Sequence, residues 1–559
     1  MRPDQIIKYF FATTALIGAS VLLAKAQEKQ EPWEDQGKLE NVEVEIINQL
    51  EIKLPKATRN FEKIPPRPSE PIRPAMTYDF RPFVFNTPEV RPLIRPLKLK
   101  QSESASVYGG TLLLGYGNYA SPYLEGFINS GRSRNKLVGA HAWLKSSVKG
   151  PVGGKNSGSG TSGISLYGRT FSNEISLSGN LGFDNRTTHF YGYPQPMEVS
   201  RDTIKQSFNH FTLGGAIENA RNSKFAYKLG GDFSYLSDKY DAKETEIDVA
   251  FGSSYRISDD QSIEITADYA YISRKDSEVA TRGRNLLQMN GGYAFTPLDG
   301  VRIRAGVNFA YENDTIDSKD VSSLSGHTRI LCAQPVCRRG GFAHRWHAEG
   351  IIIKPEPGKL VAGSQRALAH TNKQFDLEVG LKARLGNKVG VHTGLSLASL
   401  KNMYFFLNDS TDQAKFQTVY DDKATKRSNF FAALSYAQSE KAKFLLRGDL
   451  YSYLTDQLDE PWHKPTYKLS ANASYDLYSK LLFSLDLIAQ GGMKAYDFTS
   501  DKIVTLDGAF DVNFRTEYKF SQSLSFFVQL NNIASNKYPV FLNYPVRGFQ
   551  VIGGLMWSF

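Results

Sequence analysis

The residues best suited to chemistry gather between positions 327 and 370. Cys332 and Cys337 stand with four residues between them, and thiols combined with imidazoles are typical zinc ligands. The nearby imidazoles belong to His327, His344 and His347. In an oxidising compartment, two cysteines at this spacing favour a disulfide within a loop. We therefore expect a Cys332–Cys337 disulfide and no metal site, in a divergent surface loop or a stretch altered by a local frame error.

Other candidate chemistry lacks partners. His141, His210 and His392 fall in segments that we expect to be strands. A hydrolase would need a nucleophile and an orienting group beside such a histidine, and the sequence places no serine or carboxylate there. The glycine-rich run 150–156 lacks the spacing and the hydroxyl of a phosphate-binding loop. We expect neither enzyme activity nor a cofactor.

The sequence predicts that the secondary-structure elements that would position any site are β-strands. Apolar residues alternate with polar ones over 225–235 and again over 512–518, and a period of two is the signature of a strand with one apolar face. Segments of about ten residues are long enough for a tilted strand to cross a bilayer. A soluble β-sandwich or propeller would show the same alternation.

The amino-acid composition excludes some classes of protein. The chain has 559 residues, of which 41% are hydrophobic and 12% aromatic, and its mean hydropathy of −0.37 is too polar for a bundle of membrane-spanning helices. It carries 67 Lys and Arg against 57 Asp and Glu. These charges are interspersed along the chain, which argues against nucleic-acid binding.

Connection lengths favour a barrel. We expect short turns at 237–244, 258–261 and 438–442, and long polar loops near 148–163, 185–207, 313–345, 353–373, 405–428 and 491–506. Short periplasmic turns and long extracellular loops are typical of outer-membrane barrels. We therefore predict an all-β fold, an antiparallel transmembrane β-barrel over 106–559 with roughly 16 to 22 strands, 22 being favoured. The side chains expected to line its lumen are Lys224, Lys228, Asp232, Asn513, Arg515, Glu517 and Lys519.

The N-terminal part has a different character. Residues 1–26 combine basic residues, a short apolar stretch and a small-x-small cleavage pattern, which predicts a signal peptide. Residues 27–105 form a proline-rich extension that we expect to be mostly irregular and periplasmic. One short alternating segment, with Val42, Val44 and Ile46 on one face, could add as a strand to a partner's sheet edge.

The C-terminal strand carries the most specific pattern. Val551, Leu555, Trp557 and Phe559 share one face. This ending resembles the C-terminal signal that outer-membrane insertion machinery reads. We therefore expect that machinery, together with outer-membrane lipid and lipopolysaccharide, to be partners of the chain.

Just upstream, the segments 530–533, 536–538 and 544–548 resemble the closing hairpin of TonB-dependent receptor barrels: an Asn-rich strand end, a Lys-Tyr turn and a Tyr-Pro-x-x-Gly entry to the last strand. The resemblance implies such a barrel in the outer membrane of a Gram-negative bacterium, and Val42 to Ile46 resembles the coupling segment of that family. The family's globular plug is replaced here by the shorter proline-rich segment, so energised uptake is not implied.

Two functions follow from these features. In the first, the barrel binds or passes a solute, and polar residues at every second position line a water-filled lumen. In the second, the barrel is an anchor whose segment 27–105 docks a periplasmic or outer-membrane protein. We favour the first.

Overall fold

The computed structural model describes residues 109–130, 135–172, 174–193, 199–219, 223–275, 281–298, 301–313, 320–334, 340–348, 351–353, 370–386, 388–439 and 441–559. For positions 282, 298 and 320–353 the description covers the backbone alone. The predicted signal peptide, the proline-rich extension, the Val42–Ile46 strand and Cys337 lie outside the described residues.

Long antiparallel strands make up most of the described chain. Those of its first half are β1 (Gly110–Gly117), β2 (Ser121–Asn129), β3 (Lys136–Ser147), β4 (Ser159–Phe171), β5 (Ile175–His189), β6 (Lys205–Asn219), β7 (Phe225–Asp238), β8 (Lys243–Ser258), β9 (Gln261–Lys275), β10 (Arg282–Leu298), β11 (Val301–Asn313) and β12 (Asp320–Gln334). The remainder are β13 (Gly340–Ala348), β14 (Ile351–Ile353), β15 (Thr371–Leu385), β16 (Val389–Lys401), β19 (Thr425–Ser439), β20 (Ala442–Leu454), β21 (Tyr467–Leu477), β22 (Leu481–Gly491), β25 (Ala509–Lys519), β26 (Leu524–Asn531) and β29 (Gln550–Ser558).

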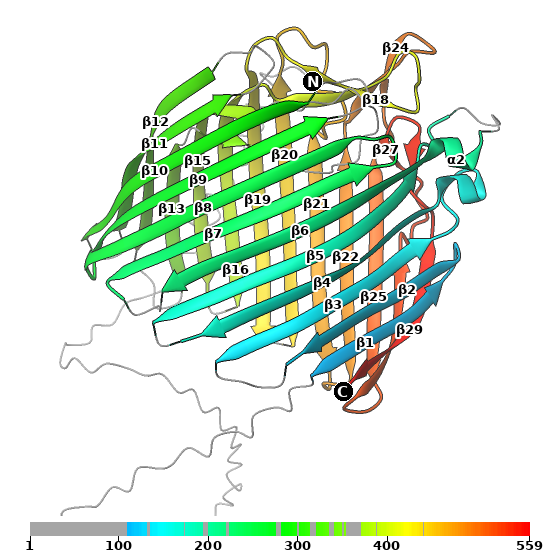
Figure 1. The fold of residues 1–559 in the computed structure, drawn as a ribbon, viewed down its shortest axis with the longest axis horizontal. Helices are drawn as coiled ribbons and strands as arrows, with labels where there is room; N and C mark the ends of the chain where they lie inside the picture. The colour runs from blue at the N-terminus through cyan, green and yellow to red at the C-terminus, as the bar shows by residue number, and fades with distance from the viewer. Residues whose placement is uncertain are drawn as a thin grey trace, which may run out of the picture. The chain divides into compact units, whose positions relative to one another are not determined.

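These strands close into a barrel (Figure 1). Each pairs with the next strand in this order, except that β13 pairs with β15 and not with β14, and β29 pairs with both β26 and β1, with Leu555 opposite Leu114 at the seam. The sheet has 23 strands in the described residues, but β13 and β14 both pair with β15 and so occupy one position, which leaves 22 around the ring. A closed ring removes the unpaired edges that a membrane does not tolerate. The predicted fold and the favoured strand number are confirmed.

The two faces of the wall differ as the alternation predicts. Leu229 on β7 and Val249 on β8 are 45% and 43% exposed on the outer face, whereas Lys228 and Asp232 line a cavity on the opposite face. Large exposed apolar side chains recur on most strands of the ring. A soluble protein rarely exposes so continuous an apolar surface, so the outer face fits lipid and the sandwich and propeller alternatives fall away.

The connections at the two ends differ in length. The turns 259–260 and 478–480 lie at the end that also holds the C-terminus, while the long connections 402–424 and 532–549 lie at the opposite end (Figure 1). One expectation is wrong: the short turn around 239–242 follows β7 at the long-loop end. Antiparallel pairing of β7 with β8 fixes that placement, whatever the length of the turn.

The loop expected at 313–345 is also wrong, as is the loop expected at 327–370 over the part of it that the structure describes. The backbone of 320–334 forms β12, which pairs with β11 and β13, and 340–348 forms β13. The ring needs strands at these positions to close, and backbone pairing supplies them even though the side-chain alternation is poor.

The long connections carry small hairpins of their own. These are β17 (Tyr404–Asn408) with β18 (Phe416–Tyr420), β23 (Lys494–Asp497) with β24 (Lys502–Thr505), and β27 (Pro539–Phe541) with β28 (Tyr544–Pro545). We call residues 402–424, 455–466, 492–508 and 532–549 the loop cluster. Its interior is aromatic: Phe405 is fully buried, and the ring of Phe416 lies 5.1 Å from that of Phe541.

Helical structure is limited to short turns in the described chain. The 3-10 helix η1 (Gly154–Ser157) occupies the glycine-rich run, and α2 (Arg201–Ile204) spans one turn. No described helix has the length and apolarity to span a membrane.

Candidate functional site

The inner wall places several predicted lumen residues together. Lys228 and Asp232 lie on one face of β7 and line a cavity of about 360 Å³ with Asn180 and Asp268 from strands β5 and β9. Gly214 on β6 faces the same space, because a side chain there would meet the carboxylate of Asp232 and the amide of Asn180. The missing side chain therefore makes room for this polar patch.

A second predicted set lies on β25. Arg515 pairs in register with Gln529, and its guanidinium lies 4.9 Å from the ring centre of Phe527, which is 2% exposed. Asn513 accepts a hydrogen bond from the backbone N–H of Asn532 at 3.0 Å, and Glu517 lies opposite Phe527 in the register. These residues alternate along β25 with Phe510 and Tyr518, which are 44% and 47% exposed, so they lie on the opposite face of the strand. Their part in solute passage stays a prediction.

The remaining predicted residues lie at the ends of strands. Lys224 is in the turn before β7, where its carbonyl accepts the N–H of Arg256, and Lys519 is the last residue of β25. At the C-terminus, the backbone of Phe559 exchanges two hydrogen bonds with Gly110, at 2.9 and 3.0 Å. Val551, Leu555 and Trp557 pair across the β26–β29 contact. The use of this strand as an insertion signal stays a prediction.

Two strand histidines have carboxylate partners that could not be placed from the sequence. His141 Nε2 lies 3.1 Å from Glu125, and His210 Nδ1 lies 3.0 Å from Asp184. Each pair links two adjacent strands, β2 with β3 and β5 with β6. Only the strand register shows that these side chains are close together. The described residues contain no group of three or more His, Cys, Asp or Glu that could hold a metal ion. The predicted disulfide cannot be placed, since Cys337 lies outside the described residues.

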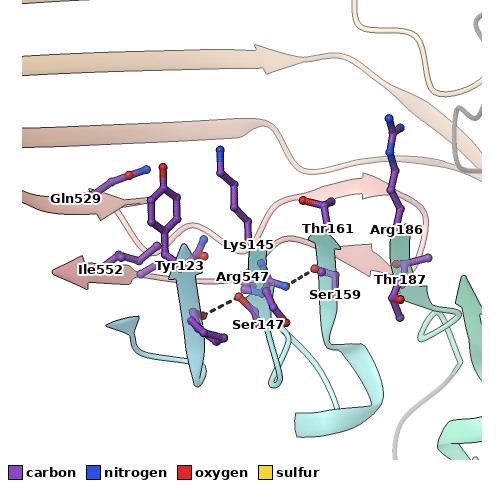
Figure 2. A pocket seen from close by; sticks show the side chains of 16 residues that line it. Tyr123, Lys145, Ser147, Ser159, Thr161, Arg186, Thr187, Gln529, Arg547 and Ile552 are labelled. Carbon is purple, nitrogen blue, oxygen red and sulfur yellow. Dashed lines mark hydrogen bonds between the residues drawn. The ribbon is translucent and has the colours of Figure 1, made fainter. Parts of the chain in front are cut away.

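A larger cavity lies on the wall at the long-loop end. Its volume is about 450 Å³, and it is formed by the ends of β2 to β5 together with β26, β29 and the closing loop 532–549. Figure 2 shows Tyr123, Lys145 and Arg186 projecting from neighbouring strands on one side of the sheet, with Arg547 reaching toward Ser159. Several hydroxyl-bearing residues complete this side of the lining, namely Ser121, Ser147, Ser159, Thr161 and Thr188.

Glu125 organises one side of this cavity. Its carboxylate accepts a hydrogen bond from the Tyr123 hydroxyl at 2.6 Å and lies 3.0 Å from Lys145 Nζ. Arg186 is paired in the same way, with Nε 3.1 Å from Asp184. Two of the three cations that line the cavity are therefore neutralised by a neighbouring carboxylate.

Arg547 comes from the closing loop and is held differently. Its Nη2 donates to Ser159 Oγ at 2.6 Å, and its backbone carbonyl accepts from Asn532 Nδ2 at 2.7 Å. Burial lowers the pKa of the guanidinium from its ordinary value. Burial also raises the pKa of the neighbouring Tyr191 to about 12, so the phenol stays neutral and supplies no counter-charge at neutral pH.

Sequence reasoning did not select Arg547 as a site residue. It lies inside the Tyr-Pro-x-x-Gly segment that resembles a family motif. The motif marks the position of Arg547 in the sequence but does not indicate that its guanidinium lines a cavity. The ring of Tyr544 in the same segment packs at a tilt against that of Tyr191, with ring centres 4.7 Å apart, and Gly548 lies close to Ser535. The motif therefore describes a loop folded against the inside of the barrel end, with one cation at the cavity.

Comparison with known proteins establishes the class of fold. No protein-family model and no curated sequence matches the chain. Among solved structures, the FrpB iron transporter from Neisseria meningitidis is similar at a TM-score of 0.62 and 10% identity, covering 81% of this chain and 82% of its own. The siderophore receptor PirA from Acinetobacter baumannii gives a TM-score of 0.62 at 10% identity, with 82% and 81% coverage. The ferric-catecholate import receptor Fiu from E. coli gives 0.60 at 8% identity, with 81% and 82% coverage.

These likenesses concern the fold. The chain has the outer-membrane barrel architecture of TonB-dependent receptors, as the closing-hairpin resemblance predicts. The similar structures are transport receptors, and their identities to this chain of 8% to 10% carry no information on its ligand.

Proposed function

We propose that this protein is an outer-membrane barrel of the receptor type that binds a solute or ligand at its lumen and allows its passage. The observation that carries the proposal is the closed ring of 22 positions whose outer face is apolar and whose inner face is polar. Such a wall suits lipid on one side and water on the other. The iron transporters and siderophore receptors of the same fold support a transport role.

The cavity at the long-loop end supports binding as part of that role. It combines paired and unpaired cations with many hydroxyl groups, a lining that recognises polar ligands. The proposal does not include energised uptake, since the plug of the family has no counterpart among the described residues. Signal-peptide export, assembly by the insertion machinery, and lipopolysaccharide contact belong to the same proposal.

Single-channel recording in planar bilayers tests this function. The mature chain from Gln27 is compared with a variant that lacks Gln27 to Leu99. We expect discrete conductance steps from at least one of the two proteins. If only the deletion conducts, the N-terminal segment gates the lumen. If both are silent while correctly folded, the passage proposal fails and the anchor function replaces it.

A further inference from the structure

The cavity at the long-loop end holds an unbalanced positive charge. Lys145 and Arg186 have carboxylate partners at 3.0 and 3.1 Å. Arg547 forms no ion pair with any residue in the described ranges, and its buried Nε lacks a hydrogen-bond partner there. Arg515 lies opposite the lining residue Gln529 in the pairing of β25 with β26.

A buried guanidinium without an ionic partner has an unfavourable free energy unless a ligand supplies hydrogen-bond acceptors. A guanidinium that is buried loses its hydrogen bonds to water. If a buried N–H group finds no acceptor in the protein, the free-energy cost of that loss is not offset. The hydrogen bond to Ser159 satisfies one donor of Arg547, whereas a guanidinium offers five. A carboxylate or a phosphate can accept hydrogen bonds from two of these donors at once, because two of its oxygens match the spacing of the guanidinium N–H groups.

The loop that carries Arg547 is fixed before any ligand arrives. Asn532, which is 2% exposed, donates to the carbonyl oxygens of Asn536 and Arg547 at 2.8 and 2.7 Å. At the far end of the loop, Asn118 Nδ2 donates to the Phe549 carbonyl at 2.9 Å. Arg547 and the loop residue two positions after it are thus held by side chains at the ends of β26 and β1, and a preorganised group binds with less loss of conformational entropy.

We propose that this cavity binds an oxyanionic group of a small polar ligand, a carboxylate or a phosphate, on the guanidinium of Arg547. The ammonium of Lys145 and the hydroxyls of Ser147 and Thr161 surround the same space, as Figure 2 shows, and complete a site for a polar anion. The volume of about 450 Å³ lies within the range of small-molecule pockets. The inference deepens the proposed function by naming the chemical class of its ligand.

Isothermal titration calorimetry of the purified mature protein in neutral detergent tests the site. The probes are succinate and inorganic phosphate, and maltose is the uncharged comparison. We expect saturable binding of at least one anion and none of maltose. Arg547→Gln should weaken that binding about tenfold or more, since it removes a charge-assisted contact. Arg547→Lys, which keeps the charge and loses the fork, should fall between the two.

The control is Arg256→Gln, which removes an exposed cation beside the short turn 259–260, away from the cavity. It should leave anion binding unchanged. The proposal is overturned if neither anion binds the intact protein, or if Arg547→Gln and Arg547→Lys both bind as the intact protein does. Calorimetry in detergent is independent of conductance, so a protein that conducts without binding anions refutes this inference and leaves the proposed function intact.

Discussion

Asn532 and Arg547 are joined by a hydrogen bond of 2.7 Å from the Asn532 side-chain amide to the Arg547 carbonyl oxygen. The same amide reaches the carbonyl of Asn536, and its oxygen accepts the Asn536 N–H at 3.0 Å. One buried side chain therefore fixes both the start of the closing loop and the residue that places a cation in the cavity. We therefore expect both the ordered conformation of the closing loop and anion binding at the cavity to depend on the side-chain amide of Asn532.

Replacing Asn532 should loosen the closing loop. Asn532→Ala leaves buried backbone groups without partners, which costs on the order of 2–4 kcal/mol in local stability. We expect faster hydrogen–deuterium exchange across 532–549 and weaker anion binding. Asn532 has φ +47°, so Asn532→Gly, which tolerates this conformation, separates loss of the amide from backbone strain. Gln457→Ala, which removes an exposed amide in the loop cluster, is the control. Unchanged exchange in both Asn532 variants would refute this role.

The loop cluster should be sensitive to acid through His463. Its Nδ1 lies 2.7 Å from the Phe406 carbonyl, and its Nε2 accepts the Leu542 N–H at 3.3 Å. Both contacts suit a neutral ring, and burial lowers the pKa of His463 from 6.5 to about 4. The unfolded loop therefore binds a proton more readily than the folded one. The stabilisation is complete above pH 6.5 and is lost as the pH falls toward 4, to a total of about 3 kcal/mol.

Protease digestion of the loop cluster measures this effect. Cleavage within 402–424 should accelerate between pH 7 and pH 4.5 when a protease active across that range is used. His463→Asn keeps a residue that tolerates the φ of +57° found there and removes the titrating group. Its cleavage rate should be higher than that of the intact protein at pH 7 and should change little with pH. An equal acid response in both proteins would assign the effect to another group.

Two adjacent glycines give a matched test of the barrel seam. A Cβ on Gly554 would overlap the Leu114 carbonyl oxygen and lie 2.6 Å from the Phe527 ring, whereas a Cβ on Gly553 meets nothing within 4 Å. Gly554→Val should therefore destabilise the closure between β29 and β1 by about 1–3 kcal/mol. Gly553→Val should change stability by less than about 0.5 kcal/mol. Heat-dependent electrophoretic mobility compares the two variants, and equal behaviour would contradict the described packing at the seam.

The barrel could be predicted from the sequence because the alternation that defines each strand is a property of consecutive residues. The alternation around Leu229 and Asp232 specifies one apolar and one polar face without reference to any other strand. The strand number followed from average segment length. The strands 320–334 and 340–348 could not be assigned in this way, because apolar and polar residue types do not alternate in their sequence and the strands are defined by pairing with β11 and β15.

The candidate site was harder to predict because it depends on register. Glu125 and His141 are 16 residues apart in sequence and 3.1 Å apart in space, and Arg547 meets Ser159 across 388 positions. A single sequence gives no information on such pairs beyond the motif that surrounds Arg547. The turn at 239–242 shows the same limit, since its length does not reveal the end of the barrel at which it lies.

Cysteine labelling in intact outer membranes tests the central claim, which is a water-filled lumen behind a lipid-facing wall. In a background of Cys332→Ser and Cys337→Ser, single cysteines replace Lys228, Asp232 and Leu229 in turn, and a membrane-impermeant maleimide is added. The account predicts that Lys228→Cys and Asp232→Cys react, whereas Leu229→Cys reacts only after denaturation. Labelling of Leu229→Cys in the membrane at the rate of its neighbour, or no labelling at either lumen position, would contradict it.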